Sequence, residues 1–235
     1  MSKIDIIIPA WNAVQWIDTC LKSIATQQSK HVIKSVLLGI DACEVTLKKI
    51  EDIYDVYKQR LPGFRVLYFN NNVGPYIVRN TLAGLGDAEY IATFDADDEM
   101  LPQYIGTLYS YRKKFDVIRC KQIRAGNLDG TQNSHGQILV RRTVFESLGG
   151  YREWRCAADS EFMDRAKRQG YFVGVARTKP IMKRRGHPRS LTQHPDTGRQ
   201  SEMRSKYNTL RKQSKMKNDN IAPYIKTDNY YEYKP

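Results

Sequence analysis

Apolar strand-like runs and amphipathic helix-like segments alternate four times within the first 100 residues. The apolar runs cover residues 4–9, 35–40, 64–69 and 90–94. In the segments between them, apolar residues recur at three- and four-residue spacing, the pattern of a helix with one buried face. Alternation on this scale predicts βαβ units and a mostly parallel central sheet. We therefore expect an α/β fold.

The pattern changes after residue 100. Helices are predicted at 101–114 and 157–169, and strands at 116–120, 137–140 and 171–176. The last eighteen residues are polar and rich in tyrosine, which predicts a loosely packed tail. The expected organisation is one domain over residues 1–199, with halves 1–100 and 101–199, and an extension over residues 200–235 made of a basic helix and a polar tail.

Length and composition are those of a globular protein. The 235 residues suffice for one α/β domain with a sizeable core. The chain contains no run of 18 apolar residues, so no membrane-spanning segment is predicted. The N-terminal run contains Asp5 and ends at Pro9, which indicates a strand and not a signal peptide. Four scattered cysteines without a C-x-x-C pair favour reduced thiols and a cytoplasmic location, the host cytoplasm if the chain is viral.

Charge is divided unevenly between the two halves. Residues 1–100 carry a net charge of −3, whereas residues 101–235 carry +16. Within 177–217, thirteen basic residues stand against two acidic ones. Such asymmetry predicts a polyanionic partner for the second half.

Three carboxylates follow the fourth predicted strand at Asp95, Asp97 and Asp98. In open α/β sheets, ligands bind at the carboxyl ends of the strands. Carboxylates this close repel one another, and a hard divalent cation would neutralise them. The motif therefore predicts a site for Mn²⁺ or Mg²⁺ that is shared with substrate phosphates.

The order and spacing of six short motifs resemble the family 2 glycosyltransferases of GT-A fold over roughly residues 3–195. The motifs are Ile4-Asp5-Ile6-Ile7-Ile8-Pro9-Ala10-Trp11-Asn12, Leu38-Gly39-Ile40-Asp41, Asn70-Asn71-Asn72-Val73-Gly74 with Arg79-Asn80, Phe94-Asp95-Ala96-Asp97-Asp98, Ala158-Asp159-Ser160-Glu161-Phe162 with Arg165, and Gly186-His187-Pro188-Arg189-Ser190-Leu191-Thr192. The resemblance implies a Rossmann-like single domain whose first half binds a nucleoside-diphosphate sugar, with UDP as the expected nucleotide.

The resemblance also implies roles for residues of the donor site. Donor-binding residues would be Pro9, Ala10, Asn12, Asp41, Gly74, Arg79, Asp95, Arg185 and Arg189. Asp41 would accept the N–H of the base, and Arg79 would reach a ribose or phosphate. Asp97 is expected to ligate the metal, with Asp98 as its rival, and His187 to join it from a loop that resembles the family's lid.

Catalysis is assigned to Asp159. An inverting transfer needs one carboxylate that removes the proton of the attacking hydroxyl. The family often has Glu-Asp at this point, whereas this chain has Ala158-Asp159, which leaves Glu161 as the alternative base.

The acceptor is predicted from the charge. The basic second half indicates DNA that carries a hydroxymethylated base, as in some bacteriophages, with Arg184, Arg211, Lys212 and Lys215 as contacts. The alternative within the family is a lipid-linked or polysaccharide sugar at a membrane surface. An alternative of another class is a non-enzymatic nucleic-acid-binding protein, which would leave the four aspartates without a role.

Overall fold

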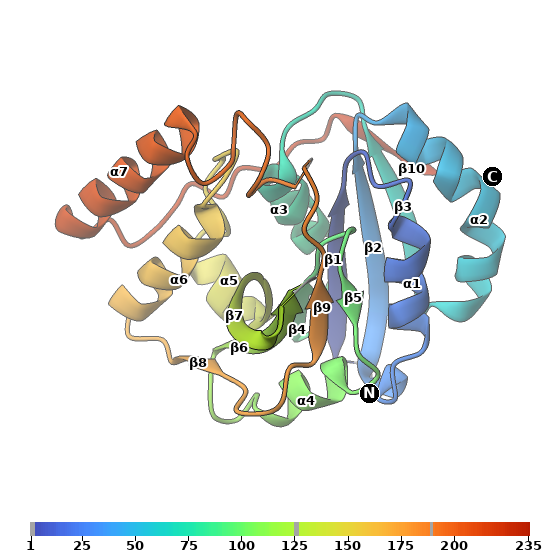
Figure 1. Ribbon diagram of the computed structural model, residues 1–235, viewed down its shortest axis with the longest axis horizontal. Helices are drawn as coiled ribbons and strands as arrows, with labels where there is room; N and C mark the ends of the chain where they lie inside the picture. Colours follow the sequence, from blue (N-terminus) through green and yellow to red (C-terminus); the bar gives the residue numbers. More distant parts are fainter. Residues whose placement is uncertain (1–2, 125–126, 189) are drawn as a thin grey trace.

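A ten-stranded mixed sheet forms the centre of the protein (Figure 1). The computed structural model describes residues 3–124, 127–188 and 190–235, with no account of the side chains of 127–131. The strands run in the order β10-β3-β2-β1-β4-β7-β6-β9-β5, and β8 pairs with β6.

The first four strands are parallel neighbours in the order β3-β2-β1-β4. They are β1 (Ile4–Ala10), β2 (Ile33–Asp41), β3 (Phe64–Phe69) and β4 (Tyr90–Thr93). Their carboxyl ends therefore share one edge of the sheet. The prediction of an α/β fold built on parallel strands is confirmed for this half.

Both faces of these strands are buried. The helices of this half are α1 (Ile17–Ala25), α2 (Glu44–Arg60) and α3 (Pro75–Leu85), and a short 3₁₀ turn, Lys30–Val32, precedes β2. Ile6 and Ile8 of β1 pack in the core of α1 and α2, and Ile7 packs with α3 on the other face, as alternating side chains of a strand require. Gly39 lets α3 approach closely, since a Cβ there would lie 2.5 Å from Cγ1 of Val78.

The second half of the sheet is mixed. It contains β5 (Glu99–Met100), β6 (Val117–Arg124), β7 (Asn127–Arg141), β8 (Val173–Val175) and β9 (Met182–Arg184). β7 is antiparallel to both β4 and β6, whereas β8 and β9 are parallel to β6. The accompanying helices are α4 (Tyr104–Ser110), α5 (Arg142–Ser147), α6 (Ala158–Arg168) and α7 (Glu202–Met216).

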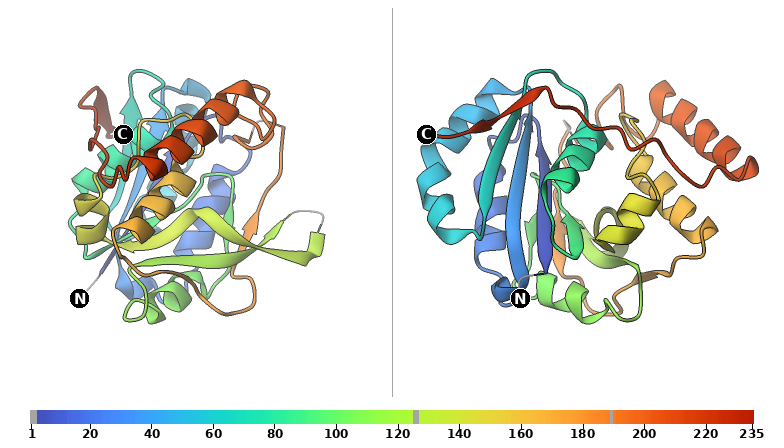
Figure 2. Two further views of the ribbon diagram at one scale, coloured as in Figure 1. Left: turned by 90° about the vertical axis from the view of Figure 1, so that its left-hand side faces the viewer. Right: turned by 180° about the vertical axis from the view of Figure 1, so that it is seen from behind.

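The C-terminal segment packs on the domain, so the prediction of a loosely packed tail is wrong. After α7 the chain crosses behind the sheet and ends as β10 (Tyr230–Tyr233), antiparallel to β3 (Figure 2, right). Aromatic pairs hold this strand, for example Tyr230 on Phe69 with ring centroids 5.5 Å apart. Glu232 also accepts two hydrogen bonds from Arg65, each 3.0 Å long. The tyrosines that suggested a polar tail are strand residues with packed rings.

None of the helices in the described part of the chain is long and apolar enough to cross a membrane.

Candidate active site

A cavity of about 700 Å³ lies at the carboxyl ends of β1, β2 and β4. Its walls come from the donor half, from β7, α6, the end of β9 and the start of α7, and from residues 185–188 and 190–201, which we call the lid. Of the predicted site residues, ten line it: Pro9, Ala10, Asp41, Gly74, Arg79, Asp95, Asp97, Asp159, Arg184 and His187.

The three aspartates after β4 form one cluster. Each offers a carboxylate oxygen, and these oxygens lie within 4.8 Å of one another. Asp98 is buried and accepts hydrogen bonds from Nε2 of Gln137 at 2.8 Å and from the backbone N–H of Arg185 at 3.0 Å. Burial, followed by the charges of Asp97 and Asp95, raises the pKa of Asp98 well above its usual value. Three oxygen donors in this arrangement suit a hard divalent cation.

Asp97 differs from Asp98 because it faces the cavity and meets the lid. Its Oδ2 lies 2.9 Å from Nε2 of His187, and the imidazole stacks on Trp16 with ring centroids 3.9 Å apart. Neighbouring ligands of an octahedral ion at about 2.1 Å stand about 3 Å apart, so this spacing fits two ligands of one Mg²⁺ or Mn²⁺. The Nδ1 atom of His187 is buried without a hydrogen-bond partner among the described residues.

Arg79 is a buried cation next to this cluster. Its Nη2 donates a hydrogen bond to Oδ1 of Asp95, and its guanidinium lies 5.3 Å from the ring centre of Tyr76. The other oxygen of Asp95 accepts from Gln137. The Nε atom of Arg79 has no partner in the described structure. Arg79 thus holds Asp95 in place at the cavity wall.

Asp41, at the end of β2, shapes the loop before α3. Its two carboxylate oxygens accept the backbone N–H groups of Val73 at 2.7 Å and Gly74 at 2.9 Å. Gly74 has φ +89°, and a Cβ there would lie 3.1 Å from the guanidinium of Arg155. The role of Asp41 toward a base stays a prediction, and its structural role is to fix this glycine turn.

Asp159 lies in the first turn of α6, on the opposite wall. Its Oδ1 accepts a hydrogen bond from the hydroxyl of Tyr76 at 3.2 Å and from its neighbour's N–H, that of Ser160, at 2.9 Å. A Cβ on Gly136 would lie 3.6 Å from Oδ2 of Asp95 and 3.8 Å from Oδ2 of Asp159. Glycine at this position therefore keeps the space between the two carboxylates free.

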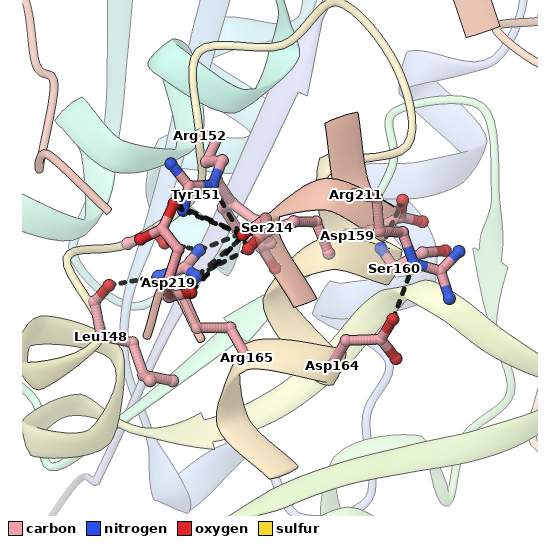
Figure 3. A network of polar contacts seen from close by, with 12 residues as sticks. Leu148, Tyr151, Arg152, Asp159, Ser160, Asp164, Arg165, Arg211, Ser214 and Asp219 are labelled. Atoms are coloured by element: carbon pink, nitrogen blue, oxygen red, sulfur yellow. Dashed lines mark hydrogen bonds and ion pairs between the residues drawn. The ribbon is translucent and has the colours of Figure 1, made fainter. Parts of the chain in front are cut away.

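Glu161, two residues later, is turned into the protein. It is 0% exposed and its carboxylate receives three hydrogen bonds from Arg165, with Arg152 at 3.3 Å. Arg165 also donates to the carbonyl of Leu148 (Figure 3). A carboxylate buried in such a network does not reach the cavity, so Glu161 is removed as the alternative base.

The match to a known family decides the family membership. A sequence profile described as Glycosyl transferase family 2 matches residues 5–178. The chain belongs to glycosyl transferase family 2. The expectation drawn from the six motifs is thereby confirmed, and the mixed sheet has the GT-A fold expected for the family.

Several relatives of family 2 are similar to this chain. The uncharacterized glycosyltransferase YibD of Escherichia coli K12 is 27% identical over 121 residues, which is 51% of this chain and 33% of YibD. Glycosyltransferase GlyA of Streptococcus pneumoniae serotype 4 is 26% identical over 137 residues, which is 58% of this chain and 18% of GlyA. This chain therefore matches only a third or less of the length of these two relatives.

Solved structures of Staphylococcus aureus TarS share the fold. TarS 1–349 in complex with UDP has a TM-score of 0.66 and 18% identity, over 79% of this chain and 61% of TarS 1–349. The complex with UDP-GlcNAc has a TM-score of 0.66 and 19% identity, over 79% and 59% of the two chains. At this identity the likeness is one of fold.

Other predicted site residues lie outside the cavity wall. Asn12 (φ 49°) donates its backbone N–H to Sγ of Cys43, and the Arg185 guanidinium lies 3.8 Å from Glu99. Arg211 donates to Asp164 of α6 at 2.7 Å (Figure 3). Lys212 and Lys215 are exposed on α7, and Arg189 lies outside the described residues. The assigned roles of these residues stay predictions.

Sequence patterns did not point to several residues that shape the site. Gln137 donates hydrogen bonds to both Asp95 and Asp98. Tyr76 donates a hydrogen bond to Asp159, and the ring of Trp16 stacks on that of His187. Arg204 of α7 donates to three lid carbonyls, those of Leu191, Thr197 and Gly198. Gln137, Tyr76 and Trp16 lie far along the chain from the residues they contact, so only the folded structure brings them together.

Proposed function

We propose that the protein is a metal-dependent, inverting glycosyltransferase that uses a nucleoside-diphosphate sugar, with UDP as the nucleotide. The observation that carries the proposal is the pairing of Asp97 with His187 on one wall of the cavity and Asp159 on the other. Family membership and the fold of TarS, which was solved with UDP and UDP-GlcNAc, support the donor class.

The first half of the chain would bind the donor. Pro9, Ala10 and Asp41 border the place for the base, and the turn at Gly74 admits the ribose. Asp97, Asp98 and His187 would hold Mn²⁺ or Mg²⁺, which stabilises the growing negative charge of the leaving diphosphate when bound. Burial raises the pKa of Asp95, and the charge of Arg79 opposes this shift, since a nearby guanidinium favours the charged carboxylate.

Asp159 would act as the general base. The acceptor hydroxyl gives its proton to the carboxylate of Asp159 while its oxygen bonds to the anomeric carbon. The bond from that carbon to the diphosphate oxygen breaks on the opposite side, and the nucleoside diphosphate leaves with the electron pair. Tyr76 and the Ser160 N–H both bind Oδ1 of Asp159, which orients the carboxylate and leaves Oδ2 to take the proton.

For the acceptor we propose a hydroxymethylated base in DNA. The net charge of +16 on residues 101–235 supports a polyanion, and a small neutral sugar would need no such field. A base within a duplex would have to leave the stack to bring its hydroxyl to Asp159. Lys212 and Lys215 on α7, with Arg184 at the cavity, are the proposed DNA contacts.

One screen tests the donor and the acceptor together. Hydrolysis of a panel of nucleotide sugars is measured with Mn²⁺, with and without hydroxymethylated duplex DNA. We expect one UDP-sugar to be hydrolysed only with metal, and its sugar to be transferred to the DNA. Transfer to lipid-linked sugar alone would reject the DNA acceptor and keep the enzyme. DNA binding with neither UDP binding nor hydrolysis would identify a non-enzymatic nucleic-acid-binding protein.

A further inference from the structure

Three arginines converge on the cavity from the side of the second half. Arg124 of β6 and Arg184 of β9 are direct neighbours in the register of two parallel strands, and both line the cavity. Arg199 of the lid lines it as well. We call these three residues the arginine cluster.

The cluster holds three like charges together on one part of the cavity wall. Among the described residues, none of the three guanidinium groups has an ion-pair partner, and Nε of Arg124 is buried without a hydrogen bond. The residues next to Arg184 are paired, since Lys183 lies 2.9 Å and Arg185 3.8 Å from Glu99. Two guanidinium groups at paired positions of neighbouring strands repel each other. A bound anion would therefore stabilise the cluster.

The charge of Asp98 acts on Arg124 and Arg184, but no described acid forms an ion pair with either guanidinium. Asp98 is buried and already accepts from Gln137 and from the backbone of Arg185. Asp196 on the cavity wall lies 3.8 Å from His194. Burial, and then the charges of Arg184 and Arg199, lower the pKa of Arg124, and the charge of Asp98 offsets part of this shift.

Arg124 lies on a different part of the cavity wall from the proposed donor contacts, whereas the charge of Arg184 also acts on Asp95 and Asp98. Arg124 belongs to β6, which forms a hairpin with β7. In this hairpin, burial lowers the pKa of Arg119 and His135, and the charge of Asp159 offsets part of the shift. His135 and Gln132 of the same hairpin line the cavity. The hairpin therefore borders Asp159, the proposed base, whereas the contacts proposed for the base and ribose of the donor lie on β1, on β2 and at the turn before α3.

We propose that the arginine cluster binds a phosphate group of the acceptor, next to the hydroxyl that receives the sugar. Guanidinium groups bind phosphate oxygens through paired N–H donors. The guanidinium groups of Arg124 and Arg184 on neighbouring strands, with that of Arg199 from the lid, can therefore surround one phosphate. This inference rests on the proposed function, because it places the phosphate relative to Asp159 as the base. It adds Arg124 and Arg199 to the contact already proposed for Arg184 in the cavity, and it assigns the three residues to one phosphate.

The test uses the full chain saturated with UDP and Mg²⁺ and a probe that carries one phosphodiester, thymidylyl-thymidine. Thymidine is the control without phosphate, and glycerol 3-phosphate against glycerol is the second pair. Calorimetry with Arg124→Gln, Arg124→Lys and Arg199→Gln is compared with Lys121→Gln. Lys121 is the matched control because it lies on the same strand but lines a separate groove with Arg177 and Lys179.

We expect the dinucleotide to bind at least about ten-fold more weakly to Arg124→Gln than to wild type, because the variant loses charge-assisted hydrogen bonds to the phosphate. Arg124→Lys should lie between, and Lys121→Gln should match wild type. Binding of the dinucleotide alone indicates a nucleic acid as the phosphate source, and binding of glycerol 3-phosphate as well indicates a general phosphate subsite.

Three results would overturn the inference. They are equal binding of thymidine and the dinucleotide, unchanged binding in Arg124→Gln, and a loss of UDP affinity in Arg124→Gln as large as the loss for the dinucleotide. The last result would assign the cluster to the donor diphosphate. If UDP does not bind wild type with metal, the proposed function fails, while the dinucleotide titration without UDP still reports on the cluster.

Discussion

The proposed donor edge and the proposed acceptor edge of the cavity differ in whether their charged side chains have partners within the protein. At the donor edge, each of Asp95, Asp97 and Asp98 has a polar partner inside the protein. At the acceptor edge, Arg124 and Arg184 stand side by side with no ion-pair partner among the described residues. Under the proposed function, the donor side would need only its metal and nucleotide, whereas the acceptor side would be completed by a bound anion.

The same contrast occurs within one helix turn of α6. Asp159 faces the cavity with two modest hydrogen bonds, and Glu161 is buried among arginines. The two carboxylates are chemically alike but differ in their surroundings. Asp159 can take up a proton in the cavity, whereas Glu161 pairs with buried arginines and stabilises the fold. Variants at the donor edge, at the acceptor edge, at Asp159 and at Glu161 can therefore be used to test these roles one by one.

The largest effect is expected from Asp97→Ala. It removes the carboxylate that meets His187, so Mn²⁺-dependent UDP binding should disappear and turnover should fall by roughly 10³ or more, because bound metal supplies several kcal/mol. Calorimetry with UDP and Mn²⁺ measures the binding. Asp52→Ala, on the exposed face of α2, is the control. Undiminished metal-dependent binding in Asp97→Ala would take Asp97 out of the metal site.

Asp159→Asn comes next. The amide keeps the shape of the side chain but cannot take a proton, so turnover should fall by roughly 10² to 10⁴ while donor affinity hardly changes. Single-turnover kinetics and UDP titration are measured on the same sample. Near-normal turnover would show that another group, or water alone, removes the proton.

Glu161→Gln tests the other carboxylate of α6. Loss of its charge leaves Arg165 buried without its ion pair, which should cost about 3–5 kcal/mol of the free energy of unfolding. Asp164→Asn is the matched control on the same helix, since its pair with Arg211 is partly exposed and should contribute no more than about 1 kcal/mol. Urea unfolding of both variants measures the difference. Equal stability of the two variants would contradict the assigned role of Glu161.

Much of this arrangement was predictable from the sequence, and the reason is local. The parallel strands of the first half and the position of the aspartates after β4 follow from alternating apolar runs and from short motifs, each within about ten residues. Asp97, Asp159 and His187 were predictable because each sits in such a motif. The sequence did not separate Asp97 from Asp98, whose difference arises when Gln137 and the backbone of Arg185 bind Asp98.

Features that depend on distant pairing were not predictable. The tyrosines of 230–233 become a strand only because β3 offers an edge, and Arg124 meets Arg184 only through the register of β6 and β9. The sequence gives only the net charge of the second half. Which of its arginines are neutralised, such as Arg211 by Asp164, is decided by packing.

Arg204→Gln sharpens the comparison at the lid, with a smaller effect. Arg204 links α7 to the lid through three carbonyls and thereby positions the segment that carries His187. Loss of these charge-assisted bonds should raise the Michaelis constant for the donor roughly ten-fold, with a smaller change in turnover at saturating donor. Arg204→Lys should recover part of the affinity. The exposed Lys206→Gln on the same helix is the control, and equal constants in all variants would remove Arg204 as a positioning residue.

The smallest effect concerns the exposed cations of α7. If Lys212 and Lys215 contact DNA phosphates, Lys212→Gln with Lys215→Gln should lower the log–log salt slope of DNA binding by about 0.9 for each phosphate lost. Arg211→Gln should change the slope less, because Asp164 already lies 2.7 Å from its guanidinium and offsets its charge. Duplex binding is measured over a series of salt concentrations, with UDP affinity as the check on folding. An equal loss of slope in the Arg211 variant would mean that DNA breaks the pair with Asp164, and an unchanged slope in the double lysine variant would place the DNA phosphates elsewhere, with the arginine cluster as the next surface to test.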